Sequence, residues 1–164
     1  MSTDGQAFTT SQTPTTGPAR VRHNSPARLA LRGVTALALL VDAVVHIRLA
    51  PGYQLSAPDG IGAGNLFRLE AAVALVAALF VVLRGTRTSY AAAFLVALSA
   101  LGAVLLYRYV NVPALGPLPA MYEPVWFLEK TLSAVAEALA VVVAGAAVFS
   151  TPGAIVPHRH AHKH

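Results

Sequence analysis

Four long apolar segments dominate the sequence and restrict its possible folds more than any other feature. Each is long enough to cross a hydrocarbon core about 30 Å thick as an α-helix rising about 1.5 Å per residue. The chain is 55% hydrophobic and only 12% charged, whereas soluble domains carry about 25% charged residues. The sequence therefore predicts an all-α, polytopic membrane four-helix bundle in contact with the lipid bilayer. The predicted helices span residues 29–49, 66–83, 90–110 and 131–150.

Basic residues set the predicted orientation of these helices. Most of them precede the first helix, join the second to the third, or follow the fourth. Because Lys and Arg are enriched in cytoplasmic loops, both termini are predicted to be cytoplasmic. The net charge of +5 does not indicate nucleic-acid binding, since these residues are spread along an apolar chain rather than gathered on one polar face. The basic residues on the predicted cytoplasmic side are Arg20, Arg22, Arg28, Arg32, Arg84, Arg87, Arg159 and Lys163. Those near the outer side are Arg48, Arg68, Arg108 and Lys130.

Two tails flank the predicted membrane domain, which covers residues 28–150. Residues 1–27 are rich in Ser, Thr, Gly and Pro and hold too few apolar side chains to offset the entropy of ordering, which predicts a disordered cytoplasmic tail. Residues 151–164 are rich in histidine and are predicted to be a cationic cytoplasmic tail attracted to anionic lipid. Weak transition-metal binding is the alternative for this tail, because alternate histidines share one side of an extended chain. These histidines are His158, His160, His162 and His164.

Ionisable residues gather near the outer ends of the predicted helices, within about 5 to 10 Å of the membrane boundary. The cytoplasmic halves of the helices contain no charge. A charged side chain at mid-bilayer costs about 2.5 to 3.5 kcal/mol on insertion scales, so these groups are expected to converge and pair inside the bundle. This outer polar layer consists of Asp42, His46, Arg48, Arg68, Glu70, Tyr107, Arg108 and Glu137.

Two interpretations of the outer polar layer follow from the spacing. Asp42 and His46 are four residues apart and share one helix face, where the carboxylate can accept a hydrogen bond from the imidazole. In a structural interpretation, the arginines extend to the outer headgroups and the acidic residues are their ion-pair partners. In a functional interpretation, the layer lines a pocket, because ionisable residues in membrane segments mostly face an interior or a water-filled cavity.

A metal ion is one ligand that the layer could bind. Asp42, His46, Glu70 and Glu137 are the candidate ligands, because nitrogen and oxygen donors on facing helices hold iron, manganese or zinc in bundle cores. Against this, the sequence has no Glu-x-x-His pair, and arginines compete for the carboxylates. Cysteine is absent from the chain, which excludes thiolate ligands and disulfides.

A quinone or a lipid head group is the second candidate ligand. His46, Tyr53, Arg68 and Tyr107 would lie near it. Haem fits less well, because His46 is the single histidine in a predicted helix and two axial imidazoles would need a dimer. The sequence therefore leaves the cofactor unassigned.

The outer connection before the fourth helix, residues 111–130, is predicted to form a lid. It contains four prolines, which prevent a continuous helix and favour an ordered, extended chain. Tyr122, Glu123 and Trp126 are the candidate lid residues above the polar layer. The alternative is an interfacial anchor for the fourth helix, since Tyr122 and Trp126 match the aromatic belt of membrane proteins.

Three stretches carry a resemblance to known proteins: VHIRLAPGYQ, GNLFRLEAAVALVAAL and LGPLPAMYEPVWFLEKTLSAVAEALA. They resemble small four-helix integral membrane proteins of actinobacteria that have no assigned activity, over residues 29–150. DoxX-type membrane proteins are similar only in size and helix count. The resemblance implies the four-helix membrane fold and no mechanism. The expected location is the bacterial cytoplasmic membrane.

Three functional hypotheses remain open from the sequence. The favoured one is a non-enzymatic assembly or accessory protein that pairs with itself or a membrane partner. Small residues that permit close helix contact support it. The alternative is a redox-associated module that binds a quinone, lipid or metal in the outer polar layer. A transporter subunit fits less well, because no charge lines the cytoplasmic halves. The small residues are Ala91, Ala92, Ala93, Gly145 and Ala146.

Overall fold

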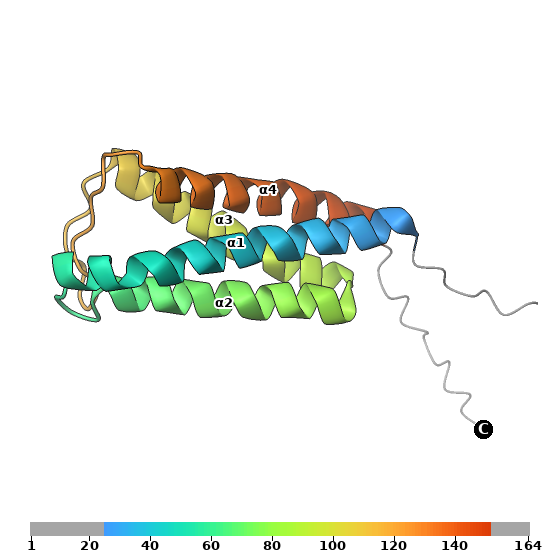
Figure 1. The fold of residues 1–164 in the computed structure, drawn as a ribbon, viewed down its shortest axis with the longest axis horizontal. Helices are drawn as coiled ribbons and strands as arrows, with labels where there is room; N and C mark the ends of the chain where they lie inside the picture. Colours follow the sequence, from blue (N-terminus) through green and yellow to red (C-terminus); the bar gives the residue numbers. More distant parts are fainter. Residues whose placement is uncertain (1–24, 152–164) are drawn as a thin grey trace, which may run out of the picture.

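A computed structural model describes residues 25–151, which form four antiparallel helices in sequence order (Figure 1). They are α1 (Pro26–Ser56), α2 (Ala63–Arg84), α3 (Arg87–Tyr109) and α4 (Leu128–Ser150). Each helix packs against the next, and α4 closes the ring against α1. This arrangement confirms the predicted all-α four-helix bundle. The start of α1 and the end of α4 share one end of the bundle, the terminal end, and we call the opposite end the lid end (Figure 1).

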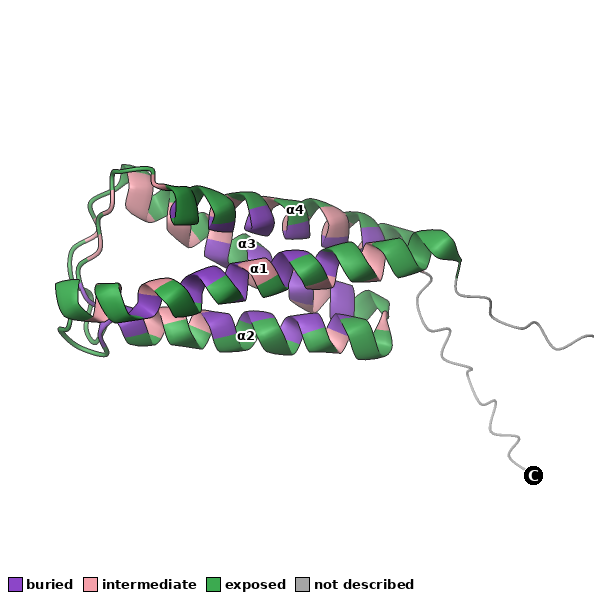
Figure 2. Ribbon diagram, in the orientation of Figure 1, coloured by how far each residue is buried: buried purple, intermediate pink, exposed green. Residues whose placement is uncertain are grey.

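All four helices are long and apolar enough to span a membrane. Large apolar side chains face outward, among them Leu37, Val76 and Val142, each more than half exposed. The inward faces hold small and polar side chains, and Figure 2 shows these buried faces turned toward the neighbouring helices. Because a water-soluble bundle has the reverse distribution, the described part of the chain is that of a multi-pass membrane protein.

Small residues form the seams between helices, where they let backbones approach closely. A side chain at Gly64 of α2 would overlap with the main-chain oxygen of Ala50 in α1. Ala93 is fully buried in the bundle, and Gly145 faces the ring of Phe94 across the α3–α4 contact. Ala93 and Gly145, which were predicted to contact another copy or a partner protein, thus pack against other helices of this chain.

The predicted end of the first helix at residue 49 is wrong, because α1 continues through Pro51 to Ser56. Proline removes one main-chain donor, but membrane helices tolerate it where neighbouring groups restore the lost contacts. Here the Tyr53 ring stacks on Phe67 of α2 with centroids 4.3 Å apart, and the Ala57 N–H donates to the Tyr53 carbonyl at 3.0 Å. Packing on α2 therefore holds the last turns of α1.

The other helix ends lie within three residues of the prediction, and each of the four helices starts three residues earlier than expected. Ser25 caps α1 by accepting a hydrogen bond from the Arg28 N–H, with proline at the first helical position. The predicted tail 1–27 therefore overlaps the start of α1. Residues 1–24 and 152–164, which include the histidine-rich tail, lie outside the described residues.

The lid runs over residues 110–127, because α4 already begins at Leu128. It is extended, with two isolated bridges that pair Val112 with Met121 and Leu115 with Leu118. Figure 1 shows it crossing the lid end from α3 to the α1–α2 loop and returning to α4. The Ile61 N–H donates to the Pro117 carbonyl at 2.9 Å, which attaches the lid to that loop.

Candidate ligand site at the lid end

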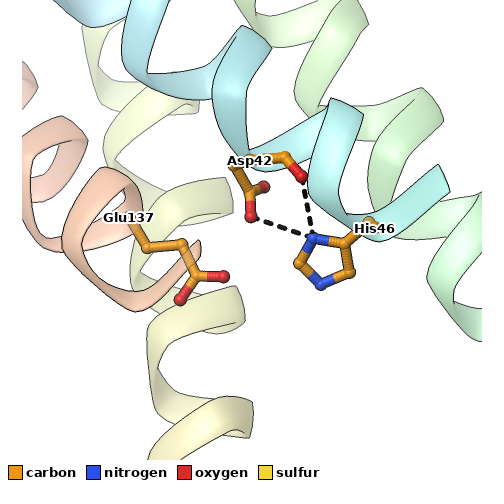
Figure 3. A group of neighbouring side chains, drawn as sticks. All are labelled: Asp42, His46 and Glu137. Atoms are coloured by element: carbon orange, nitrogen blue, oxygen red, sulfur yellow. Dashed lines mark hydrogen bonds and ion pairs between the residues drawn. The ribbon is translucent and has the colours of Figure 1, made fainter. Parts of the chain in front are cut away.

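Three buried ionisable side chains meet between α1 and α4: Asp42, His46 and Glu137 (Figure 3). One nitrogen or oxygen atom from each lies within 4.8 Å of the other two. Asp42 and Glu137 are each only 1% exposed. Of the four predicted metal ligands, the structure thus gathers three, and we call them the triad.

Asp42 holds the imidazole of His46 in place. Nδ1 of His46 lies 2.9 Å from Oδ1 of Asp42 and 3.1 Å from the main-chain oxygen of the same residue, one helical turn earlier. The His46 ring also contacts an aromatic side chain, since the centroid of the Phe67 ring lies 5.1 Å from that of His46. The predicted contact between residues four apart on one helix face is confirmed.

Ser133 of α4 joins the two carboxylates of the triad. Its hydroxyl lies 2.7 Å from Oδ1 of Asp42 and 2.9 Å from Oε1 of Glu137. A serine hydroxyl carries one proton and can donate it to one acceptor at a time. Ser133 can therefore serve only one of the two carboxylates at a time, and Nδ1 of His46 is the second donor, directed at Asp42.

Three carboxylate oxygens of the predicted polar layer have no hydrogen-bond partner among the described residues. Oδ2 of Asp42, Oε2 of Glu137 and Oε1 of Glu70 are buried and accept no hydrogen bond from the residues that the structure describes. Buried polar atoms are paired in most native structures, so exceptions point to a site that holds something else. Glu70 is half-buried and lies outside the triad.

A cavity of about 480 Å³ lies beside the triad and beneath the lid. Apolar side chains form most of its wall, and lid residues from Leu118 to Glu123 cover it. Its size falls within the range of about 300 to 1,000 Å³ that is usual for small-molecule sites. The polar and aromatic residues in its wall include His46, Tyr53, Phe67, Glu70, Tyr107, Glu123, Lys130 and Ser133.

Glu123 attaches the lid to three helices. Its N–H donates to the Tyr107 carbonyl of α3 at 3.0 Å, and its carboxylate accepts a 3.5 Å contact from the Tyr53 hydroxyl of α1. The buried Lys130 ammonium of α4 donates to its main-chain oxygen. Tyr122 also lines the cavity, whereas Trp126 lies outside it, with its ring centroid 5.6 Å from the Lys130 Nζ.

The three arginines of the predicted polar layer do not join the triad. Arg48 and Arg68 are exposed, and Arg68 donates to Asn65 on its own helix at 2.7 Å. Arg108 lies over the ring of Tyr109, 5.0 Å from its centroid. Between residues 25 and 151, no arginine forms an ion pair with a carboxylate. The structural interpretation, in which arginines pair with the acidic residues, is therefore wrong for this part of the chain.

Sequence reasoning missed three members of the site. Ser133 lies one turn before Glu137 on the same helix face, a spacing that could have indicated it. Lys130 was assigned to the outer side but not to the layer, and Phe67 carries no charge to mark it. Lys130 and Phe67 are recognisable only from the cavity that they line.

Comparison with known protein families, curated proteins and solved structures finds no match to this chain. The resemblance to small actinobacterial membrane proteins therefore stays a prediction.

Proposed function

We propose that this chain is a non-enzymatic accessory protein of the bacterial cytoplasmic membrane that binds a lipophilic small molecule with a planar, hydrogen-bonding head group, such as a quinone. The observation that carries this proposal is the cavity beneath the lid. Ligand sites of this size are mostly apolar, with a few convergent polar groups that orient the ligand. The wall has this composition, and it belongs to helices that can span a membrane.

The aromatic side chains support a planar head group. The rings of Tyr53 and Phe67 stack with an interplanar angle of 22°, and Tyr107 lines the same cavity. Offset stacking on such rings is favourable for a flat conjugated ligand. Hydrogen-bond donors for its carbonyl groups are available from Lys130 and the Tyr107 hydroxyl.

Basic residues support an orientation with the lid on the outer face. Eight of the twelve Lys and Arg residues occur at one of three places in the sequence: before the apolar part of α1, between the apolar parts of α2 and α3, or after α4. The positive-inside rule then puts the terminal end in the cytoplasm. A ligand would reach the cavity from the outer half of the bilayer.

Fluorescence of Trp126, the single tryptophan of the chain, can test the proposed ligand. Purified protein in nanodiscs is titrated with a short-chain naphthoquinone or benzoquinone, which quenches tryptophan fluorescence. We expect saturable quenching for the wild type. Ala103→Phe, which fills the cavity from α3, is expected to weaken apparent affinity at least tenfold, because the added ring occupies the ligand's volume.

Ala72→Phe is the matched control, because Ala72 is exposed on α2 and does not line the cavity. It adds the same ring on the lipid-facing side and is expected to leave the titration unchanged. Quenching that does not saturate and is equal in all three proteins would reflect partition of the quinone into lipid and would contradict the proposal.

A further inference from the structure

We propose that the triad binds one divalent first-row transition-metal ion, such as Mn²⁺, Fe²⁺ or Zn²⁺, between α1 and α4. The triad lies next to the proposed ligand cavity, but metal binding does not depend on that ligand. The two proposals therefore stand or fall separately.

The donor set selects the class of ion. One imidazole nitrogen and two carboxylate oxygens suit manganese, iron and zinc, whereas Ca²⁺ and Mg²⁺ prefer oxygen ligands alone. The three donor atoms lie within 4.8 Å of one another. Because two ligands about 2.1 Å from one ion lie about 3.0 to 3.4 Å apart at octahedral or tetrahedral angles, a pair of donors separated by the full 4.8 Å would close by about 1.4 to 1.8 Å on binding.

Two carboxylate oxygens of this cluster have no hydrogen-bond partner within residues 25–151. Oδ2 of Asp42 and Oε2 of Glu137 accept no hydrogen bond from the described residues, although both side chains are 99% buried. Figure 3 shows the two carboxylates turned toward each other and toward the His46 ring. A buried acceptor without a partner is costly, and more so when it is charged. A coordinated ion would give both oxygens a partner.

Charge balance favours a divalent cation over a simple hydrogen-bonded cluster. Two carboxylates lie inside the bundle, and within residues 25–151 no lysine or arginine forms an ion pair with either. A charge of +2 would neutralise the pair while His46 remains neutral, as a metal ligand must be. Ser133 would then donate to one ligating carboxylate and fix its orientation, the usual role of such an outer partner.

The cavity gives an ion a route to the triad. His46 and Ser133 lie in the cavity wall, whereas Asp42 and Glu137 are behind it. An ion can thus enter from the cavity and keep one or more coordination positions on that side for water. Glu70 also lines the cavity, but its carboxylate is not within reach of the triad donors.

Manganese binding to the full-length chain tests the proposal. His158, His160, His162 and His164 are replaced by alanine first, because the histidine-rich tail would bind metal by itself. The protein is stripped with chelator, and the loss of the aqueous Mn²⁺ electron paramagnetic resonance signal is followed during titration. We expect one ion per chain. Glu137→Gln and Asp42→Asn, which keep side-chain shape, are expected to weaken binding at least tenfold.

Glu70→Gln is the control, because it removes a nearby carboxylate outside the triad and should change the affinity less than twofold. A second measurement needs no variant: a directly bound imidazole should give nitrogen modulation of the electron spin echo from Mn²⁺. Absence of stoichiometric binding, equal binding by Glu137→Gln, or absence of nitrogen modulation would each overturn the proposal. A proton shared by the two carboxyl groups through Ser133 would then account for the cluster.

Discussion

At the residue scale, the site depends on polar side chains that have only one another as partners. Ser133 is the clearest case, because its hydroxyl serves both Asp42 and Glu137 at 3% exposure. The loss of one oxygen atom should therefore affect two carboxylates.

Ser133→Ala is expected to lower the free energy of unfolding by about 1 to 3 kcal/mol, the cost of leaving buried acceptors without a donor. Denaturation in mixed detergent micelles measures it. Ser150→Ala is the control on the same helix, since Ser150 is exposed and donates only to the Ala146 carbonyl of its own helix. Equal stability of the two variants would show that the Ser133 contacts contribute nothing.

At the element scale, the small residues of the α1–α2 seam determine how closely these helices approach. Gly64 lies against Ala50 and Gln54, so the last turns of α1 can pack on the first turn of α2 only where no side chain intervenes. The same approach brings Tyr53 onto Phe67 and forms one wall of the cavity.

Gly64→Ala is expected to cost about 1 to 3 kcal/mol of stability through overpacking. The matched control is Gly102→Ala in α3, where an added Cβ meets nothing within 4 Å; it should leave stability unchanged or raise it by up to about 1 kcal/mol, since alanine favours the helix. The same detergent denaturation compares the two variants. A Gly64→Ala protein as stable as Gly102→Ala would contradict the close approach of α1 and α2.

At the scale of the whole molecule, the outward apolar surface fits lipid contact, and the basic residues support the proposed orientation. All four helices cross in alternating directions, so the α1–α2 loop and the lid share one side and the α2–α3 loop lies on the other. The proposed orientation assigns the lid side to the outside of the cell.

Single cysteines can test this orientation cleanly, because the chain contains none. Asp59→Cys in the α1–α2 loop and Leu115→Cys in the lid should react with a membrane-impermeant maleimide in intact cells. Thr88→Cys, at the start of α3, should react only after the membrane is permeabilised, because the proposed orientation places it on the cytoplasmic side. All three positions are exposed. The reverse labelling pattern would place the lid and the cavity on the cytoplasmic side.

The sequence by itself determined the number of helices, the ends of the last three to within three residues, the apolar exterior, and the contact between Asp42 and His46. These follow from local quantities: hydrophobic length, charge position and a spacing of four residues on one helix. Depth along each helix also indicated that Glu70, Glu137 and the arginines share one layer near the lid end.

Only the tertiary structure decided which members of that layer touch. Glu137 joins the triad, Glu70 faces the cavity, and Arg48 and Arg68 turn outward, although all lie at similar depth. Ser133 enters the cluster because α4 packs beside α1. The physical reason is that depth follows from position along one helix, whereas contact depends on how each helix is rotated and which neighbour it meets. That rotation is set by packing of small residues contributed by all four helices.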